Sequence, residues 1–261
     1  LAVGVQQNFS TYPQSVFQID IDPAQISQGN HVCGIVGDAR LVLETLVQTI
    51  SATIPARAAH AAALHAEIHA LNAARFEPTR QLQPQWSFMQ AIRAALPTDG
   101  TLVQGMNQMG YYSRNYFKTY APRTYLTSSA LSTLGAAFPL ALGAKVAQPH
   151  RAVLAIEGDG GFLYNAQELA TAVQHNIPVV VLVFNDNAYG NVLRAQIEQF
   201  DGRVLGTRLH NPDFVKLAEA YGARGVRVQD ALQLEAALRS AFADTQPTLI
   251  EAPVGPLQRE F

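Results

Sequence analysis

The sequence has 261 residues, of which 48% are hydrophobic and 15% are charged, and its formal net charge is −2. This balance provides no basic surface for nucleic acid, and no apolar run reaches the roughly 18 residues that a membrane-spanning helix needs. The composition favours an α/β protein with a large buried sheet.

The cysteine content and the first residues bear on the compartment. Cys33 is the single cysteine, so it forms no disulfide within the sequence, which suits a reducing environment. The first residues lack the basic region and apolar core of a secretory signal. We therefore expect a cytoplasmic protein.

Residues 1–50 predict a partial α/β unit. Residues 15–22 alternate apolar and polar side chains as a strand does, and residues 31–50 predict a short strand, a turn at Gly37 and a helix capped by Asp38. Two strands are too few to close a sheet. We expect residues 1–50 to be the end of a domain that begins before Leu1.

Residues 51–85 predict a helical linker. Residues 54–76 are rich in alanine and contain no glycine, which favours a helix, and the helix should end near Pro78. His65 and His69 lie four residues apart on this helix, with His60 nearby, so a zinc site is one interpretation. Their order is not the His-Glu-x-x-His of metalloproteases, and we favour a solvent-exposed helix.

From Trp86 onwards, predicted helices and strands alternate. Helices are expected in residues 86–96, 128–148, 165–176, 211–222 and 230–244, and strands in residues 97–106, 151–158, 178–184, 223–228 and 247–254. Asn211 should cap its helix and Gly222 should end it. This order predicts a parallel sheet with helices on both faces, with residues 178–184 as a central strand. Residues 86–261 thus form the main domain.

Acidic side chains follow two successive predicted strands, Asp159 after one and Asp186 after the next. Ligands of an open parallel sheet bind at the carboxyl ends of its strands, so both carboxylates should reach one ion. Oxygen ligands suit Mg²⁺ or Ca²⁺ rather than zinc. Gly158, Gly160 and Gly161 let backbone N–H groups approach an anion. A metal with a diphosphate is therefore favoured, and the alternative is that the two acids only form turns.

The same residues carry a resemblance to a known family. Gly158-Asp159-Gly160, followed after 24 residues by Asn185-Asp186, resembles the diphosphate motif of thiamine-diphosphate enzymes, in which GDG precedes NN or ND. The resemblance covers residues 86–254, and residues 1–50 resemble the end of that family's central domain. It implies the thiamine-diphosphate-binding fold, with thiamine diphosphate and Mg²⁺ as cofactors.

The resemblance also implies roles for individual residues. Asp159, Asp186 and the backbone carbonyl of Ala188 would bind the metal, although asparagine is commoner in the family where Asp186 stands. Leu134 would pack beneath the cofactor and hold it bent, or it is an ordinary core leucine. The cofactor-binding residues implied are Ser132, Thr133, Leu134, Gly158, Asp159, Gly160, Gly161, Asp186, Ala188, Tyr189 and Gly190. Gln108 and Tyr111 lie in the segment that lines the cofactor ring in the family.

Members of this family cleave or join carbon–carbon bonds at 2-oxo acids. Residues 206–223 and 247–255 are similar to acetolactate-synthase-like and benzoylformate-decarboxylase-like members. Acetolactate synthases carry a tryptophan about where Ala195 stands, so decarboxylation and carboligation both stay open. The expected function is that of a thiamine-diphosphate- and Mg-dependent lyase or transferase. The alternatives are a simple 2-oxo acid decarboxylase and a cofactor-binding module or subunit with no activity alone.

The family's activating glutamate lies in an N-terminal pyrimidine-binding domain, and no glutamate in this sequence matches it. We therefore assign no catalytic residue, and we expect that domain to come from the same or a separate chain. Family active sites lie between two chains, which implies a homodimer or homotetramer. A small 2-oxo acid is the expected substrate, and neither nucleic acid nor a membrane is an expected partner.

Overall fold

The structure is a computed structural model that describes residues 2–3, 15–53, 58–75, 77, 82–128 and 131–257. These residues form two compact units, Leu1–Asn72 and Ala73–Phe261. Residues 54–57 and 76 of the predicted linker helix lie outside the described residues. The predicted division into residues 1–50, 51–85 and 86–261 stays a prediction.

The first unit contains a small parallel sheet in the order β1-β2-β3. Its elements are β1 (Ala2–Val3), β2 (Val16–Asp20), the 3-10 helix η1 (Pro23–Gln25), β3 (Val32–Val36), α1 (Ala39–Thr53) and most of α2 (Ala58–Arg75). The Asp38 cap is confirmed, because Asp38 Oδ1 accepts a hydrogen bond from the N–H of Leu41 at 3.1 Å. Both predicted strands are present, and β1 adds a third.

The second unit is built on a six-stranded sheet in the order β5-β4-β6-β7-β9-β8, and every pair in it is parallel. The strands are β4 (Thr101–Gln104), β5 (Tyr125–Thr127), β6 (Val153–Gly158), β7 (Val180–Asn185), β8 (Arg224–Arg227) and β9 (Thr248–Pro253). The predicted parallel α/β fold is confirmed. The short edge strand β5 was not predicted.

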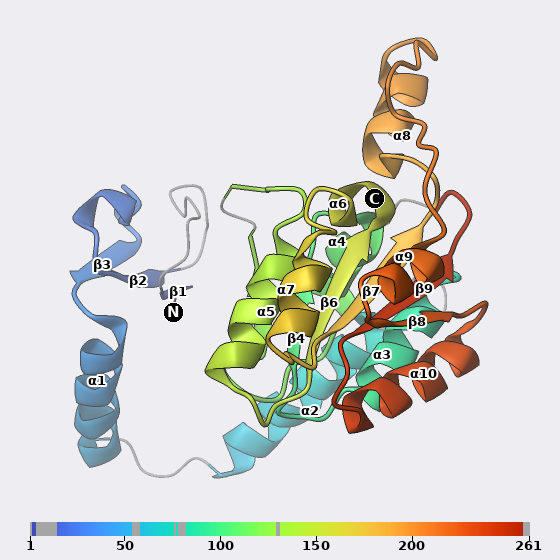
Figure 1. Cartoon of the computed structure of the whole chain (residues 1–261). Coiled ribbons are helices and arrows are strands. Elements are labelled where there is room, and N and C mark those ends of the chain that lie inside the picture. Colours follow the sequence, from blue (N-terminus) through green and yellow to red (C-terminus); the bar gives the residue numbers. More distant parts are fainter. Residues whose placement is uncertain are drawn as a thin grey trace. The chain divides into compact units, whose positions relative to one another are not determined.

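Helices cover both faces of this sheet (Figure 1). They are α3 (Gln85–Ala95), α4 (Gln108–Tyr116), α5 (Ala137–Ala147), α6 (Asp159–Phe162), α7 (Glu168–Gln174), α9 (Phe214–Ala220) and α10 (Ala231–Ala243). The helix α8 (Gly190–Gln199) has no buried residue and projects away from the sheet (Figure 1). Along β7, Leu182 packs with α3, α4 and α10, whereas Val181 and Val183 pack with α5, α7 and α9. The apolar run of β7 is therefore continuous for the predicted reason, because helices bury the strand on both faces of the sheet. No helix among the described residues is long and apolar enough to cross a membrane.

The cap of α9 corrects one prediction. Asp213, not Asn211, caps this helix, since its side chain accepts hydrogen bonds from the N–H groups of Val215 and Lys216 at 3.1 and 3.3 Å. The side chain of Asn211 points instead towards Asp159, to which it donates a hydrogen bond. Gly222, which has a φ of 84°, follows the helix as predicted.

The core of the second unit should depend on β7. We expect Leu182→Ala to lower the free energy of unfolding by about 2–5 kcal/mol, because the fully buried leucine would leave a cavity that its neighbours only partly fill. Chemical denaturation measures the change. Leu232→Ala, at a side chain that is 81% exposed, is the control and should change it by less than about 0.5 kcal/mol. Equal losses in the two variants would contradict the packing described.

Candidate functional site

Two carboxylates lie at the carboxyl ends of neighbouring strands. β6 and β7 pair directly, with Gly158 opposite Phe184, so Asp159 and Asp186 each follow the end of a paired strand. Both side chains line the same cavity. The predicted proximity of the two acids is therefore seen in the structure.

Burial raises the pKa values of both acids, and the neighbouring charge adds to the rise at Asp186. Burial, followed by the charge of Asp159, raises the pKa of Asp186 from 3.8 to about 6. Burial also raises the pKa of Asp159, and a hydrogen bond from Asn211 partly opposes this. Among the described residues that line the cavity, none is Lys, Arg or His. The two carboxylates thus lack a lining basic side chain, and a bound cation would relieve their repulsion.

The number of acidic ligands limits what a cation would find here. In the described part of the chain, no group of three or more His, Cys, Asp and Glu side chains could hold a metal ion. A cation between Asp159 and Asp186 would therefore take its other ligands from neutral oxygens of the protein, from water or from a bound anion. That is the usual arrangement for Mg²⁺, which keeps waters and binds phosphate oxygens.

The turn after β7 is held in one conformation. Asn187 has a φ of 55°, a left-handed conformation that asparagine tolerates, and its carbonyl accepts a hydrogen bond from the N–H of Leu209 at 2.8 Å. The N–H of Ala188 donates to Asp186 Oδ1 at 3.2 Å, and Ala188 pairs with Arg208 in an antiparallel bridge. These contacts fix the backbone at Ala188, whose N–H lies beside the Asp186 carboxylate.

Glycines are required where the backbone meets side chains at the cavity. A Cβ atom on Gly160 would collide with the ring of Tyr189, and one on Gly190 would collide with a carboxylate oxygen of Asp186. Small residues at these positions therefore leave the cavity open and the backbone accessible.

The structure brings together all but one of the predicted binding residues. The cavity is lined by Ser132, Leu134, Gly158, Asp159, Gly160, Gly161, Asp186, Ala188, Tyr189 and Gly190, and also by Gln108 and Tyr111. Thr133 does not line it. Leu134 is 38% exposed, so it does not belong to the buried core. The binding roles of these residues stay predictions.

Several residues of the site were not among the predicted binding residues. Asn107, Asn191 and Leu257 also line the cavity, although they lie in three distant segments. Arg194 on α8 donates hydrogen bonds to Gln108 and, at 2.7 Å, to the carbonyl of Leu257. Asn107 lies in the segment that the resemblance places at the cofactor ring, whereas Leu257 lies near the cavity only because of the fold.

A buried glutamate lies behind the glycine turn. Glu157, which ends the buried part of β6, accepts hydrogen bonds from the N–H groups of Ala137 and Phe138 at 2.9 and 3.3 Å, where α5 begins. Burial raises the pKa of Glu157 to about 7, against the effect of these two hydrogen bonds. Glu157 thereby ties β6 to the helix that follows the Ser132–Leu134 segment.

Comparison with known proteins adds independent information. The family model described as "Thiamine pyrophosphate enzyme, C-terminal TPP binding domain" matches residues 105–252. A probable acetolactate synthase large subunit of Methanocaldococcus jannaschii is 35% identical over 253 residues, covering 93% of this chain and 42% of that protein. A probable 2-ketoarginine decarboxylase of Pseudomonas aeruginosa is 38% identical over 242 residues, covering 90% of this chain and 42% of that protein. An acetolactate synthase large subunit of Corynebacterium glutamicum is 33% identical over 255 residues, covering 92% and 40%. The chain thus spans less than half the length of each of these relatives.

The raised pKa of Asp186 predicts a stability effect. A folded-state pKa above the ordinary value favours the protonated acid, so stability is lost as the pH rises from about 4 through about 6. Asp186→Asn cannot ionise, and we expect it to raise the metal-free free energy of unfolding at neutral pH by about 1 kcal/mol, after allowance for solvent screening. Denaturation across this pH range measures the effect.

Asp201→Asn is the control, because that carboxylate is 93% exposed and should give a change below about 0.5 kcal/mol. A variant at Asp186 that is less stable than the parent protein at neutral pH without metal would contradict the raised pKa of Asp186.

Proposed function

We propose that this chain binds Mg²⁺ and thiamine pyrophosphate (thiamine diphosphate) in the cavity at the ends of β6 and β7. The chain belongs to the thiamine pyrophosphate enzymes and contains their C-terminal cofactor-binding domain. We further propose that it acts on 2-oxo acids. The observation that supports the metal site is the pair of adjacent carboxylates, together with a cavity whose described lining residues include no Lys, Arg or His.

The donor set of the cavity fits Mg²⁺ bound with a diphosphate. Asp159, Asp186 and the carbonyl of Ala188 would supply oxygen ligands, and the anion would supply more. Gly160 and Gly161 would donate backbone N–H groups to the phosphate oxygens, because neither residue has a side chain to keep an anion away. Ser132, Tyr189 and Gly190 would line the bound cofactor.

The residues of this chain would bind and orient the cofactor. When bound, thiamine diphosphate supplies carbanion stabilisation for bond cleavage beside a carbonyl. Leu134, an apolar side chain that lines the cavity and is 38% exposed, would pack beneath the cofactor and hold it bent. Thr133 would support that loop rather than contact the cofactor directly.

The reaction we favour is decarboxylation, carboligation or both, as in an acetolactate-synthase-like lyase or transferase. The names of the relatives support this range, because they include both synthase subunits and a decarboxylase. Ala195, which replaces a tryptophan expected of acetolactate synthases, favours the decarboxylase as the second candidate. A module that binds the cofactor without activity alone is the other alternative.

We propose the same context for the protein as the family implies. The activating glutamate would come from an N-terminal pyrimidine-binding domain in the same or a separate chain, and the protein would form a homodimer or homotetramer. The division into residues 1–50, 51–85 and 86–261 belongs to this proposal. We place the protein in the cytoplasm, since Cys33 has no cysteine partner within the sequence.

The metal site can be tested by binding. We expect Asp159→Ala to abolish Mg²⁺-dependent binding of thiamine diphosphate, because one of two carboxylate ligands is lost, while the fold is kept. Calorimetric titration measures binding and a thermal melt checks the fold. Asp99→Ala, at an exposed turn, is the control and should bind normally. Unchanged affinity in folded Asp159→Ala would refute the proposed ligand.

The proposed reaction can be tested by product analysis with pyruvate and benzoylformate. We expect no CO₂ release from the 261-residue chain by itself, because no glutamate in it matches the activating residue. We expect release once the pyrimidine-binding domain is supplied. Turnover by the isolated chain would contradict the proposal that this glutamate lies outside it. Acetolactate among the products would favour carboligation over simple decarboxylation.

A further inference from the structure

The side chain of Asn211 has one orientation, which the oxygens around it determine. Its Nδ2 donates to Asp159 Oδ2 at 2.6 Å and to Asn185 Oδ1 at 2.8 Å, and Asn187 Oδ1 lies farther away at 3.4 Å. The two shorter contacts account for both amide hydrogens. A flipped amide would place its oxygen against both of these acceptors. Asn211 therefore holds one carboxylate oxygen of Asp159 in a fixed direction.

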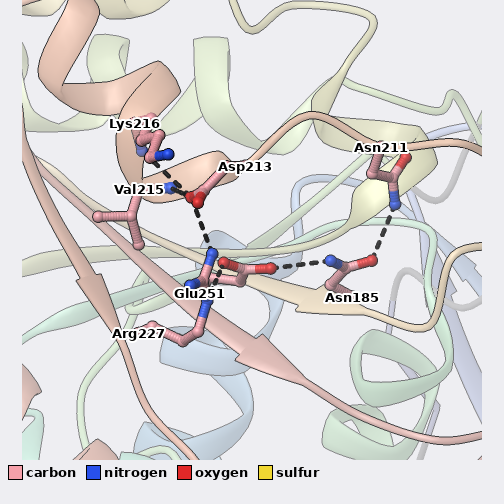
Figure 2. Close-up of polar contacts among 7 residues, drawn as sticks. All are labelled: Asn185, Asn211, Asp213, Val215, Lys216, Arg227 and Glu251. Atoms are coloured by element: carbon pink, nitrogen blue, oxygen red, sulfur yellow. Dashed lines mark hydrogen bonds and ion pairs between the residues drawn. The ribbon is translucent and has the colours of Figure 1, made fainter.

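Asn185 is fixed in turn by a buried carboxylate. Its Nδ2 donates to Glu251 Oε1 at 2.8 Å, and the two residues are only 8% and 3% exposed. The other oxygen of Glu251 accepts a hydrogen bond from Arg227 Nε at 2.8 Å (Figure 2). Arginine only donates hydrogen bonds and an ionised carboxylate only accepts them. The donor and acceptor of each hydrogen bond from Arg227 through Glu251 to Asn185 are therefore defined. This assignment leaves Asn185 Oδ1 facing the amide of Asn211.

Arg227 also holds the backbone that carries Asn211. Its second nitrogen donates to Asp213 Oδ1 at 2.8 Å, two residues beyond Asn211 (Figure 2). Asp213 is the cap of α9, and its pKa is lowered mainly by the N–H of Lys216 and also by the charge of Arg227. The contacts form a ring. Arg227 is linked to Asn211 through the side chains of Glu251 and Asn185, and also through Asp213 and the backbone between Asp213 and Asn211.

We propose that Asn211 is a positioning residue for metal binding, which holds the Asp159 carboxylate in the orientation of a ligand. Arg227 and Glu251 act through it as remote positioning residues. The inference rests on the proposed function, since it concerns the same metal. Partners of metal ligands commonly change metal affinity by about 10–100-fold when they are removed.

The two amides separate the positive charge of Arg227 from the acids. An arginine in direct contact with Asp159 would neutralise it and compete with a cation. A neutral amide donor fixes the carboxylate and leaves its charge available. The arrangement therefore combines a rigid anchor on β8 with a cavity that stays negative.

The test measures Mg²⁺ affinity by calorimetry in the full-length protein with saturating thiamine diphosphate. We expect Asn211→Ala to weaken Mg²⁺ binding about 10-fold or more, and Arg227→Gln by a smaller factor, about 3-fold or more. Arg224→Gln is the matched control. Arg224 lies on the same strand, is 33% exposed against 39% for Arg227, and pairs with Asp244 at 3.4 Å. Arg224 is not part of the series of hydrogen bonds that ends at Asp159, so its loss should leave Mg²⁺ affinity unchanged.

A purely structural role predicts different results. It would lower the melting temperature of Asn211→Ala or Arg227→Gln without changing the Mg²⁺ affinity of the folded protein, and that outcome would overturn the inference. So would an equal loss of affinity in Arg224→Gln. If Asn211→Ala does not fold, the Mg²⁺ affinity of Arg227→Gln, a change at a partly exposed side chain, still tests the inference. In the double variant the two fold-losses should not multiply, because both changes act on one chain of contacts.

Parallel titration of the parent protein and Asp159→Ala separates the two proposals. If Mg²⁺ promotes cofactor binding only in the parent protein, the proposed function stands and the Asn211 result decides the positioning role. If the parent protein shows no Mg²⁺-dependent binding, the proposed function fails and the positioning role fails with it.

Discussion

The direct pairing of β6 with β7 is the constraint on which the site depends. Because the strands are parallel and hydrogen-bonded from Leu154 to Gly158, their carboxyl ends cannot separate, and the acids that follow them are held together. Burial and, after it, the charge of Asp159 raise the pKa of Asp186, so holding both acids ionised in this site is unfavourable. The apolar layers on both faces of the sheet stabilise this unfavourable pair. The fold thus keeps the two acids of the proposed cation site together, whereas isolated turns could move apart.

Neutral amides surround these carboxylates where charged donors would have given more stability. Asn211 donates to Asp159, while Asn185 and Asn187 shape the turn that precedes Ala188. A lysine in place of Asn211 would remove the repulsion but would also occupy the position of a cation. The arrangement is a case in which stability and binding favour different residues. Arg227 pairs with Glu251 instead, and the amides of Asn185 and Asn211 separate that pair from Asp159.

The sequence predicted the parallel sheet and the pair of acids because both follow from local patterns. An apolar run such as residues 178–184 and an acid just after it can be read within one segment. The contact between Asn211 and Asp159 spans 52 residues, and no local rule contains it. Asn211 and Asp213 both suit a helix cap, and only the tertiary partners determine that Asp213 caps α9. The three-residue edge strand β5 is too short to produce a periodic signal.

One strand end sets the geometry of both sides of the cavity. Asp159 turns towards the proposed metal, whereas Glu157, two residues earlier, binds the start of α5. The segment that carries Leu134 lies just before that helix, and Asn165 holds it to the glycine turn by donating to the carbonyl of Gly135 at 2.8 Å. The spacing between the acids and Leu134 is therefore set by neighbouring residues of a rigid strand rather than by a free loop. Sites built on such elements keep their geometry best, and a cofactor that must be bound at its diphosphate and bent at its middle requires both positions to be fixed together.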